Sequence, residues 1–338
     1  MTKLHHGGRL REAAARYDIP LQQWLDLSTG INPEGWPVPP LPADCWQRLP
    51  EAEDGLERAA SDYYGTEHIL PIAGSQAAIQ ALPLLRPPCR VGLLAPSYAE
   101  HAAAWSRQGH EVITLHAGAI PPQLPRLDVL LLVNPNNPTG ESFAPEQLLD
   151  WHATLATNGG WLVVDEAFMD TTPEQSVARH CGEPGLIVLR SLGKFFGLAG
   201  ARVGFAAAWP SLLQRLGDML GPWAVSGPAR EVARRALADE RWQAKTRQQL
   251  MQQGKRLQQL LTRSGLAPAG GNALFQYCPT AQAKWLHESL ARQGILTRLF
   301  EEPPAVRFGL PGDEVTWLRL EQALSKCQMN ANRKVVEC

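Results

Sequence analysis

Short apolar runs alternate with helix-like segments through the middle of the chain. The apolar runs are VGLLA (91–95), EVITL (111–115), DVLLLV (128–133), WLVVD (161–165) and LIVLR (186–190), and the helix-like segments span 74–85, 99–108 and 145–157. Continuous apolar runs of this length are typical of strands that are buried on both faces of a parallel sheet. The pattern therefore predicts an α/β fold with a mostly parallel sheet.

The pattern changes near residue 221, where the breaker-rich sequence GPWAVSGP begins. Beyond it we expect a long helical stretch at 228–263, then a strand (273–278), a helix (282–293), a strand (305–310) and a helix (313–327). This order predicts a second, smaller α+β domain. The predicted division is an N-terminal arm and helix at 1–30, a large domain at 56–221, and a small domain formed by 31–55 and 222–338.

Composition narrows the class of protein. The chain has 338 residues, of which 44% are hydrophobic and 19% charged, as in ordinary globular proteins. Its formal net charge of −1 gives no electrostatic reason to expect nucleic acid or a membrane surface as a partner. The start shows no apolar segment of a signal peptide, and the six cysteines are scattered without metal-binding spacing. We expect a cytoplasmic enzyme without a metal site.

Four polar motifs lie where a predicted strand ends or a predicted helix begins. They are Gly74-Ser75-Gln76, NPNNPTG at 134–140, Asp165, and SLGKFFGLAGARVGF at 191–205. Ligands of open α/β sheets bind at the carboxyl ends of the strands. Taken singly, a Gly-Ser helix start is usually a cap, and an aspartate after a strand is often a turn residue. Their occurrence together, in this order, predicts a ligand site.

The lysine of the fourth motif, Lys194, has apolar neighbours such as Leu192, Phe195 and Phe196. A lysine on a protein surface is usually solvated, whereas a lysine among apolar groups tends to lose its proton. The neutral amine is a nucleophile toward carbonyl carbon atoms. The stretch therefore predicts a lysine that forms a Schiff base.

Pyridoxal phosphate requires residues of the kinds found in these motifs. It needs a lysine for the covalent bond, a carboxylate beside its pyridine nitrogen, and a cup of donors for its phosphate. Asp165 can supply the carboxylate, and Ser75, Ser191 and Arg202 can supply the cup. A nucleotide-binding P-loop is excluded at Lys194 because the pattern GxxxxGK[ST] is absent.

The same motifs resemble a known family. DEAF at 165–168, NPNNPTG, and SxxKxxxxxxxR across 191–202 closely resemble fold-type I pyridoxal-phosphate enzymes, in the branch that contains histidinol-phosphate aminotransferase. The resemblance implies a homodimer whose large domain binds the cofactor. It also implies that Asn137 hydrogen-bonds the ring oxygen of the cofactor and that Asp165 pairs with its pyridine nitrogen. Tyr98 would stack on the ring, and Arg307 in RFGLP would bind the substrate carboxylate. The implied cofactor-binding residues are Gly74, Ser75, Gln76, Tyr98, Asn137, Asp165, Ser191, Lys194 and Arg202.

The N-terminal sequence HGGRLREAAARYDIPLQQWLDLSTGINPEG (6–35) is similar to the opening of the threonine-phosphate decarboxylases of cobalamin biosynthesis. The two glycines can offer N–H donors to a ligand at close range, and the imidazole of His6 can add a charge-assisted bond to a phosphate. We therefore expect residues 5–9 to fold over the substrate phosphate, with Arg9 as the least certain contact. The substrate-binding residues that this similarity implies, together with the family motifs, are His6, Gly7, Gly8, Asn32, Asn137 and Arg307. The alternative is that the residues around His5 and His6 form a loose terminus or the remnant of a tag.

Two positions depart from the family pattern. Phe168 replaces a tyrosine that many relatives carry three residues after the aspartate, so it cannot hydrogen-bond the ring oxygen. Leu49 replaces a tyrosine that reaches the neighbouring subunit's cofactor phosphate. The first departure favours the decarboxylases, in which phenylalanine also occurs. The second means either that another residue supplies this phosphate contact or that the phosphate has one contact fewer.

The leading hypothesis is decarboxylation of L-threonine O-3-phosphate to (R)-1-aminopropan-2-ol O-phosphate and CO2, in cobalamin biosynthesis. Lys194 and Asp165 are the expected catalytic residues. The alternative is an aminotransferase such as histidinol-phosphate aminotransferase, which would use the same residues but place the Cα–H bond, rather than the carboxylate, perpendicular to the ring. A third reading, a non-enzymatic regulatory domain, is disfavoured because the chain has no attached DNA-binding segment.

Overall fold

The computed structural model describes residues 6–336 and divides the chain into two compact units. The larger unit comprises Gly35–Asn137 and Glu141–Arg247, and the smaller comprises the chain up to Glu34, Pro138–Gly140 and the chain from Gln248. The first five residues of the predicted arm lie outside the described part. The two units are described separately below.

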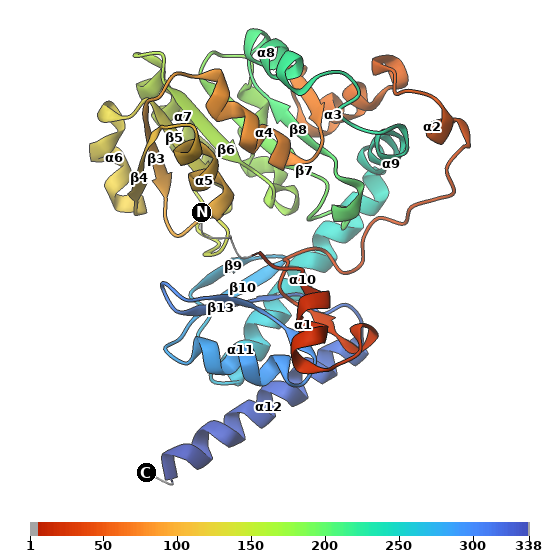
Figure 1. Ribbon diagram of the computed structural model, residues 1–338, viewed down its shortest axis with the longest axis vertical. Coiled ribbons are helices and arrows are strands. Elements are labelled where there is room, and N and C mark those ends of the chain that lie inside the picture. Colours follow the sequence, from red (N-terminus) through yellow and green to blue (C-terminus); the bar gives the residue numbers. More distant parts are fainter. Residues whose placement is uncertain (1–5, 337–338) are drawn as a thin grey trace. The chain divides into compact units, whose positions relative to one another are not determined.

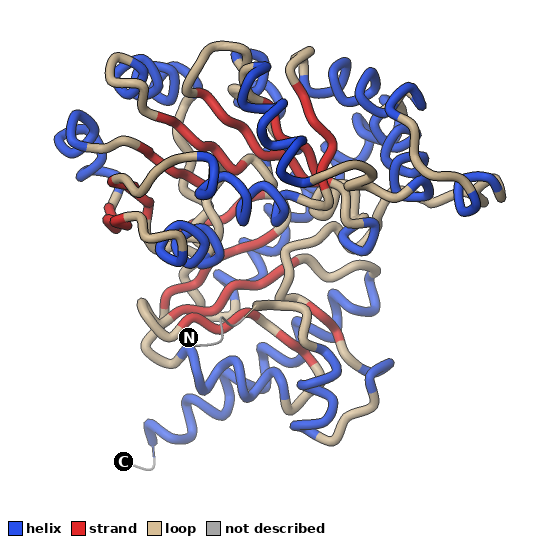
Figure 2. The backbone as a smooth tube through the Cα atoms, turned by 45° about the horizontal axis from the view of Figure 1, so that its top comes forward, coloured by secondary structure: helices blue, strands red, loops and turns tan. Residues whose placement is uncertain are grey.

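A seven-stranded sheet forms the centre of the larger unit (Figures 1 and 2). Its strands, in spatial order, are β2 (Ile69–Ile72), β8 (Gly204–Ala207), β7 (Leu186–Ser191), β6 (Trp161–Asp165), β5 (Val129–Val133), β3 (Arg90–Leu94) and β4 (Glu111–Leu115). The strands from β7 to β4 run parallel, whereas β8 runs antiparallel to both of its neighbours. The predicted α/β class with a mostly parallel sheet is confirmed.

Alternate residues of each strand face different halves of the core. Val163 of β6 packs with α4 (Ser75–Ala81), α5 (Ala99–Arg107) and α8 (Pro210–Leu220). Its neighbours Leu162 and Val164 pack on the other face with α7 (Pro145–Ala156). Both faces are therefore buried, which is why these strands are continuously apolar in sequence.

The remaining elements of the larger unit lie outside this sheet. They are α2 (Asp44–Gln47), α3 (Leu56–Tyr64), α6 (Ile120–Gln123), α9 (Gly227–Leu237) and the first part of α10 (Glu240–Arg263). The predicted helix at 228–263 is thus two helices, α9 and α10. The apolar runs that form β3 to β7 were predicted, but β2 and β8 were not. Strand β8 follows a glycine-rich stretch, and β2 contains Pro71, both of which weaken the strand pattern.

The smaller unit has a four-stranded antiparallel sheet in the order β12 (Arg298–Phe300), β13 (Ala305–Gly309), β10 (Phe275–Pro279) and β9 (Gly270–Asn272). A short parallel pair joins β1 (Leu25–Asp26) to β11 (Ile295–Leu296). The helices are α1 (Leu10–Tyr17), the end of α10, α11 (Ala283–Ala291) and α12 (Glu314–Val336). None of the helices within residues 6–336 is long and apolar enough to cross a membrane.

The boundaries of the units differ from the predicted domain boundaries. Residues 35–55 and 222–247 belong to the larger unit, although the sequence pattern placed them with the small domain. The physical reason is that α9 packs against α3, which belongs to the larger unit, and against the segment before it. Arg230 donates hydrogen bonds to Asp54 at 2.6 Å and to Glu57 at 2.7 Å. Gly227 also lies against the backbone of Cys45, where a Cβ would be 2.4 Å from the carbonyl oxygen.

Candidate functional site

Asp165 ends strand β6 at the edge of the sheet where the parallel strands present their carboxyl ends. It is buried, with 3% of its surface exposed. Its Oδ1 accepts a hydrogen bond from the Ala167 N–H at 3.1 Å, and its Oδ2 lies 2.9 Å from His101 Nε2. An ionised carboxylate can only accept, so Nε2 of His101 carries the hydrogen. The carboxylate is thus held in a fixed orientation.

His101 is a site residue that sequence reasoning missed. It lies in the first turn of α5, three residues after Tyr98, and its ring meets the Tyr98 ring edge-on at 6.0 Å between centroids. One histidine therefore contacts both Asp165 and the predicted stacking residue. The signal that could have found it is its spacing from Tyr98, because residues three apart share one face of a helix.

Lys194 follows β7 and is half-buried between the buried rings and chains of Leu192, Phe195 and Phe196. Its Nζ lies 5.4 Å from the centre of the Phe168 ring. Phe168 itself is 3% exposed, and it offers the lysine an apolar face without a hydroxyl group. The neighbours of Lys194 in sequence are thus buried apolar side chains, as the sequence pattern indicated, and its Nζ lies over an aromatic ring.

The residues predicted to bind the cofactor phosphate lie at the start of α4, at the end of β7 and just before β8. Gly74 has φ +71°, and a Cβ at this position would lie 2.7 Å from the Arg202 guanidinium. A side chain at Gly204 would likewise meet the Ser75 N–H, and Gly204 pairs with Ser191 across the β7–β8 ladder. The cup is therefore a glycine-lined cradle bordered by serine and arginine, which suits a phosphate.

Gln76 and Tyr98 are joined to one another. The Tyr98 hydroxyl donates to Gln76 Oε1 at 3.3 Å, and Gln76 Nε2 donates to Glu100 at 3.1 Å. Burial raises the pKa of Tyr98 to about 12, with the carboxylates of Glu100 and Asp165 adding to the effect. Tyr98 is thus a neutral, fixed ring at neutral pH.

The NPNNPTG loop has two structural asparagines and a third in a different setting. Asn134 exchanges two hydrogen bonds with the backbone of Phe143, and Asn136 accepts from the Ser97 hydroxyl at 2.9 Å. Both are buried, whereas Asn137 is half-buried. The structure therefore assigns Asn134 and Asn136 to holding the loop, and it leaves Asn137 with surface that a ligand can reach.

Arg307 is buried in the smaller unit on strand β13. Its Nη2 donates to the Ser28 carbonyl at 2.7 Å. Burial lowers the pKa of this guanidinium, and the charge of Arg298, its cross-strand neighbour, lowers it further, while Asp26 partly opposes the shift. A negatively charged ligand would relieve this unfavourable setting.

The N-terminal arm also packs against Ser28, the residue that Arg307 contacts. The Gly8 N–H donates to Ser28 Oγ at 2.7 Å, and Gly8 has φ +79°. A Cβ on Gly7 would lie 2.3 Å from the Ser28 carbonyl oxygen. Both glycines are therefore required by the backbone itself, which explains the His-Gly-Gly sequence. Asn32 is also buried, and it accepts the Glu34 N–H at 2.9 Å.

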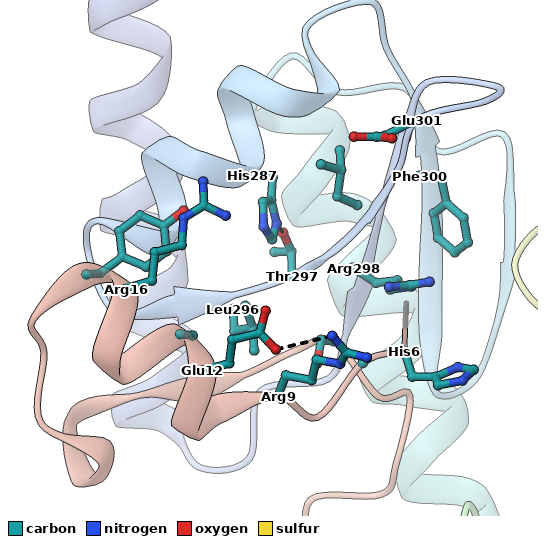
Figure 3. Close-up of a pocket in the computed structure, with 15 residues that line it drawn as sticks. His6, Arg9, Glu12, Arg16, His287, Leu296, Thr297, Arg298, Phe300 and Glu301 are labelled. Carbon is teal, nitrogen blue, oxygen red and sulfur yellow. Dashed lines mark hydrogen bonds and ion pairs between the residues drawn. The ribbon is translucent and has the colours of Figure 1, made fainter. Parts of the chain in front are cut away.

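A cavity of about 400 Å³ lies beside the arm (Figure 3). Three arginines and two histidines line it together with Glu12 and Glu301, and Arg9 is paired with Glu12 at 3.2 Å. Figure 3 shows the guanidinium groups of Arg9 and Arg298 beside His6, with His287 farther along the cavity. Burial lowers the pKa of Arg298, and the charge of Arg9 lowers it further. The pKa of His287 is lowered by burial and by Arg16. Arg298, Arg16 and His287 were missed from sequence, although Arg298 lies opposite Arg307 in the sheet.

Comparisons with known proteins agree with this geometry. A model of the aminotransferase class I and II family matches residues 49–332. The threonine-phosphate decarboxylase of Pseudomonas aeruginosa is 59% identical over 95% of this chain and 97% of its own length. A histidinol-phosphate aminotransferase of Cronobacter sakazakii is 32% identical over 62% of this chain and 63% of its own. The histidinol-phosphate aminotransferase of Sinorhizobium meliloti, solved with pyridoxal-5'-phosphate, shares the fold, with a TM-score of 0.80 at 18% identity, over 98% of this chain and all of that chain.

Proposed function

The chain belongs to the class I and II aminotransferase family, and we propose that it decarboxylates L-threonine O-3-phosphate to (R)-1-aminopropan-2-ol O-phosphate and CO2. The observation that carries this proposal is the 59% identity, over nearly the full length of both chains, with a protein named threonine-phosphate decarboxylase. Similarity to the histidinol-phosphate aminotransferase is lower and covers less of the chain. The described residues add a basic cavity suited to a phosphorylated substrate.

The residues of the larger unit fit pyridoxal 5'-phosphate, the cofactor of this family. The glycine cradle at Gly74 accepts a phosphate held by Ser75, Ser191 and Arg202, and the buried Asp165 carboxylate suits a pyridinium nitrogen. Lys194 would hold the cofactor covalently through Nζ. When bound, this group supplies an electron sink for the bond that breaks at the substrate Cα.

The other predicted contacts complete that set. Tyr98, fixed through Gln76, would stack on the cofactor ring, and Asn137 would bond its ring oxygen. Phe168 cannot share the second task, so Asn137 performs it alone. With the cofactor and substrate bound, Lys194 Nζ would be the group that returns a proton to Cα once CO2 has left.

In the smaller unit we assign the substrate carboxylate to Arg307 and the substrate phosphate to the arm. His6, Gly7 and Gly8 would contact the phosphate together with Arg9, and the cavity adds Arg298 to this group. Closely placed guanidinium groups bind phosphate through charge-assisted hydrogen bonds. Asn32 and Asn137 are the remaining proposed substrate contacts.

The assembly and setting are also proposals. A homodimer is supported by large apolar side chains that are exposed on the larger unit, namely Val38, Trp46, Leu49 and Trp223. Leu49, at 64% exposure, has no hydroxyl for a partner's cofactor.

The five described cysteines are free, which fits a reducing compartment such as the cytoplasm. A place in cobalamin biosynthesis follows from the proposed product.

One experiment separates decarboxylation from transamination. The purified holoenzyme is incubated with L-threonine O-3-phosphate in the absence of any keto acid, and released CO2 and the phosphorylated amino alcohol are measured. We expect repeated turnover. A protein that releases no CO2 but transfers an amino group from histidinol phosphate to a keto acid would contradict the proposal and support the aminotransferase.

A further inference from the structure

We propose that Arg190 is a positioning residue that fixes Asp165 and Phe168 relative to Lys194. It lies outside the proposed contacts to substrate and cofactor, and in the sequence it is only the last residue of the apolar run LIVLR (186–190). The inference rests on the proposed function, because it assumes that Asp165 and Lys194 hold two ends of one cofactor.

The guanidinium of Arg190 binds both ends of one loop. Nη1 donates to Glu166 Oε2 at 2.6 Å, and Nη2 donates to Asp170 Oδ1 at 2.7 Å. Arg190 is 1% exposed, and both carboxylates are fully buried. One rigid, planar group therefore sets the distance between the first and last residues of the segment 166–170.

This loop directly follows strand β6 and lies beside the lysine that follows strand β7. Asp165 immediately precedes it, and Phe168 at its centre lies against Lys194 Nζ. Arg190 itself lies four residues before Lys194 on the neighbouring strand. The Glu166 N–H also donates to the Leu189 carbonyl at 2.8 Å. The arginine thus ties the chain around Asp165 to the chain that leads to Lys194.

The buried ion-paired cluster of Arg190, Glu166 and Asp170 is an inefficient way to stabilise the fold, because burying charged groups costs free energy. Burial raises the pKa of Glu166 despite the opposing effects of Arg190 and Ser176. Buried ion pairs often stabilise a fold no better than apolar residues of the same volume, whereas their geometry is fixed. The same arginine packs over the Tyr64 ring at 4.6 Å, and Asp170 accepts from the Tyr63 hydroxyl at 3.1 Å. Rigid placement of the loop is the gain that this arrangement offers.

A matched control exists in the same unit. Arg230 also bridges two carboxylates, those of Asp54 and Glu57, and it is 7% exposed. Its partners lie outside the segments that carry Asp165 and Lys194. Substitution by lysine keeps the charge at either position but removes the planar fork. Arg190→Lys and Arg230→Lys therefore remove the same kind of contact, with different consequences if Arg190 positions the site.

The test compares the two variants as holoenzymes at a temperature at which circular dichroism shows both folded. The readouts are the pH titration of the bound cofactor's visible absorbance, kcat and KM for threonine phosphate, and the melting temperature. For Arg190→Lys we expect the titration midpoint to shift by roughly one pH unit. We expect kcat to fall about tenfold to a hundredfold, because a displacement of about 1 Å can cost that much. KM should change by less than about threefold, since the contacts to substrate carboxylate and phosphate remain.

Loss of melting temperature alone, with the cofactor titration and kcat equal to those of Arg230→Lys, would overturn the inference. If Arg190→Lys does not fold, Asp170→Asn serves instead, since it weakens only one end of the clamp, and the same two outcomes decide. Failure of the wild-type protein to bind pyridoxal phosphate at Lys194 would instead defeat the proposed function.

Discussion

Arg190 in the larger unit and Arg307 in the smaller unit are both buried, but the charges around them are opposite. Burial by itself would lower the pKa of Arg190, yet Asp170 and Glu166 raise it above its ordinary value. Burial lowers the pKa of Arg307, and the charged neighbour with the largest effect, Arg298, lowers it further. The first arginine has its counter-ions inside the protein, and the second lies in a setting that favours an anion from outside.

This difference separates a residue that holds structure from one that holds a ligand. A buried charge satisfied by internal carboxylates is fixed in both the free and the bound protein. A buried cation beside another cation is unfavourable in the free protein and becomes favourable when an anionic ligand arrives. Stability and binding should therefore respond in opposite ways to removal of the two arginines.

The largest contrast is expected between Arg190→Met and Arg307→Met. Removing Arg190 leaves two buried carboxylates, so the free energy of unfolding should fall by about 3 kcal/mol or more. Removing Arg307 costs its hydrogen bond to the Ser28 carbonyl but also removes a buried charge beside Arg298, so the free energy of unfolding should fall by only about 1 kcal/mol. Its kcat/KM for threonine phosphate should nevertheless fall a hundredfold or more, on the order of 3 kcal/mol of lost binding.

Denaturant unfolding and steady-state kinetics check both variants. A large loss of stability in Arg307→Met would show that its role is structural, and the contrast between the two arginines would fail.

The next effect concerns the arm that packs on Ser28. A Cβ on Gly7 would lie 2.3 Å from the Ser28 carbonyl, so Gly7→Ala must displace the arm. We expect KM for threonine phosphate to rise about tenfold or more, because a charge-assisted contact to the phosphate would be lost. The absorbance of the cofactor should not change. Removal of residues 1–8 should raise KM further.

Gly118→Ala is the control, because a Cβ there meets only ordinary contacts at 3.5 Å. Wild-type kcat/KM in the truncated protein would show that the arm plays no part in binding.

A smaller effect should be visible with inorganic phosphate alone. The cluster of Arg9, Arg298 and His6 lines one cavity, so phosphate should stabilise the holoenzyme. At ten times its dissociation constant the gain is about 1.4 kcal/mol. Arg298→Ala should abolish the gain, whereas Arg58→Ala, at an exposed site in the larger unit, should retain it. Equal stabilisation of both variants, measured by thermal unfolding, would exclude this cavity as the anion site.

The smallest effect is expected at His101. Its Nε2–H holds the Asp165 carboxylate at 2.9 Å. His101→Leu should weaken the binding of pyridoxal phosphate about fivefold, the value of one hydrogen bond of about 1 kcal/mol. His101→Gln, which can still donate, should recover part of the affinity in a fluorescence titration of the apoprotein. His152→Leu, on the surface of the same unit, is the control. Identical affinities in all three variants would remove His101 from the site.

In the larger unit, the features that short stretches of sequence determine could be predicted. The strands β3 to β7 are continuous apolar runs, and Asp165 and Lys194 lie at or just beyond strand ends. Arg190 could not be found in this way, and His101 only through its spacing from Tyr98. His101 meets an aspartate 64 residues away, and Arg190 meets carboxylates 20 and 24 residues away.

In the smaller unit the family motifs identified Arg307 and the glycines, but the cavity escaped prediction. Its lining comes from residues 6–28 and 287–301, two segments that are far apart in the sequence. Arg298 also comes to lie opposite Arg307 only through the pairing of β12 with β13. The unit boundaries were missed for a similar reason, since the contacts of Arg230 with Asp54 and Glu57 span more than 170 residues.

The central claim is that Lys194 carries the cofactor in the larger unit, and one measurement tests it directly. The holoenzyme is reduced with borohydride, digested and mapped by mass spectrometry to find the residue that bears the pyridoxyl group. The account predicts a single modified peptide that contains Lys194, and no modification in the Lys194→Ala variant. Modification of Lys245 or Lys255 in place of Lys194 would contradict it.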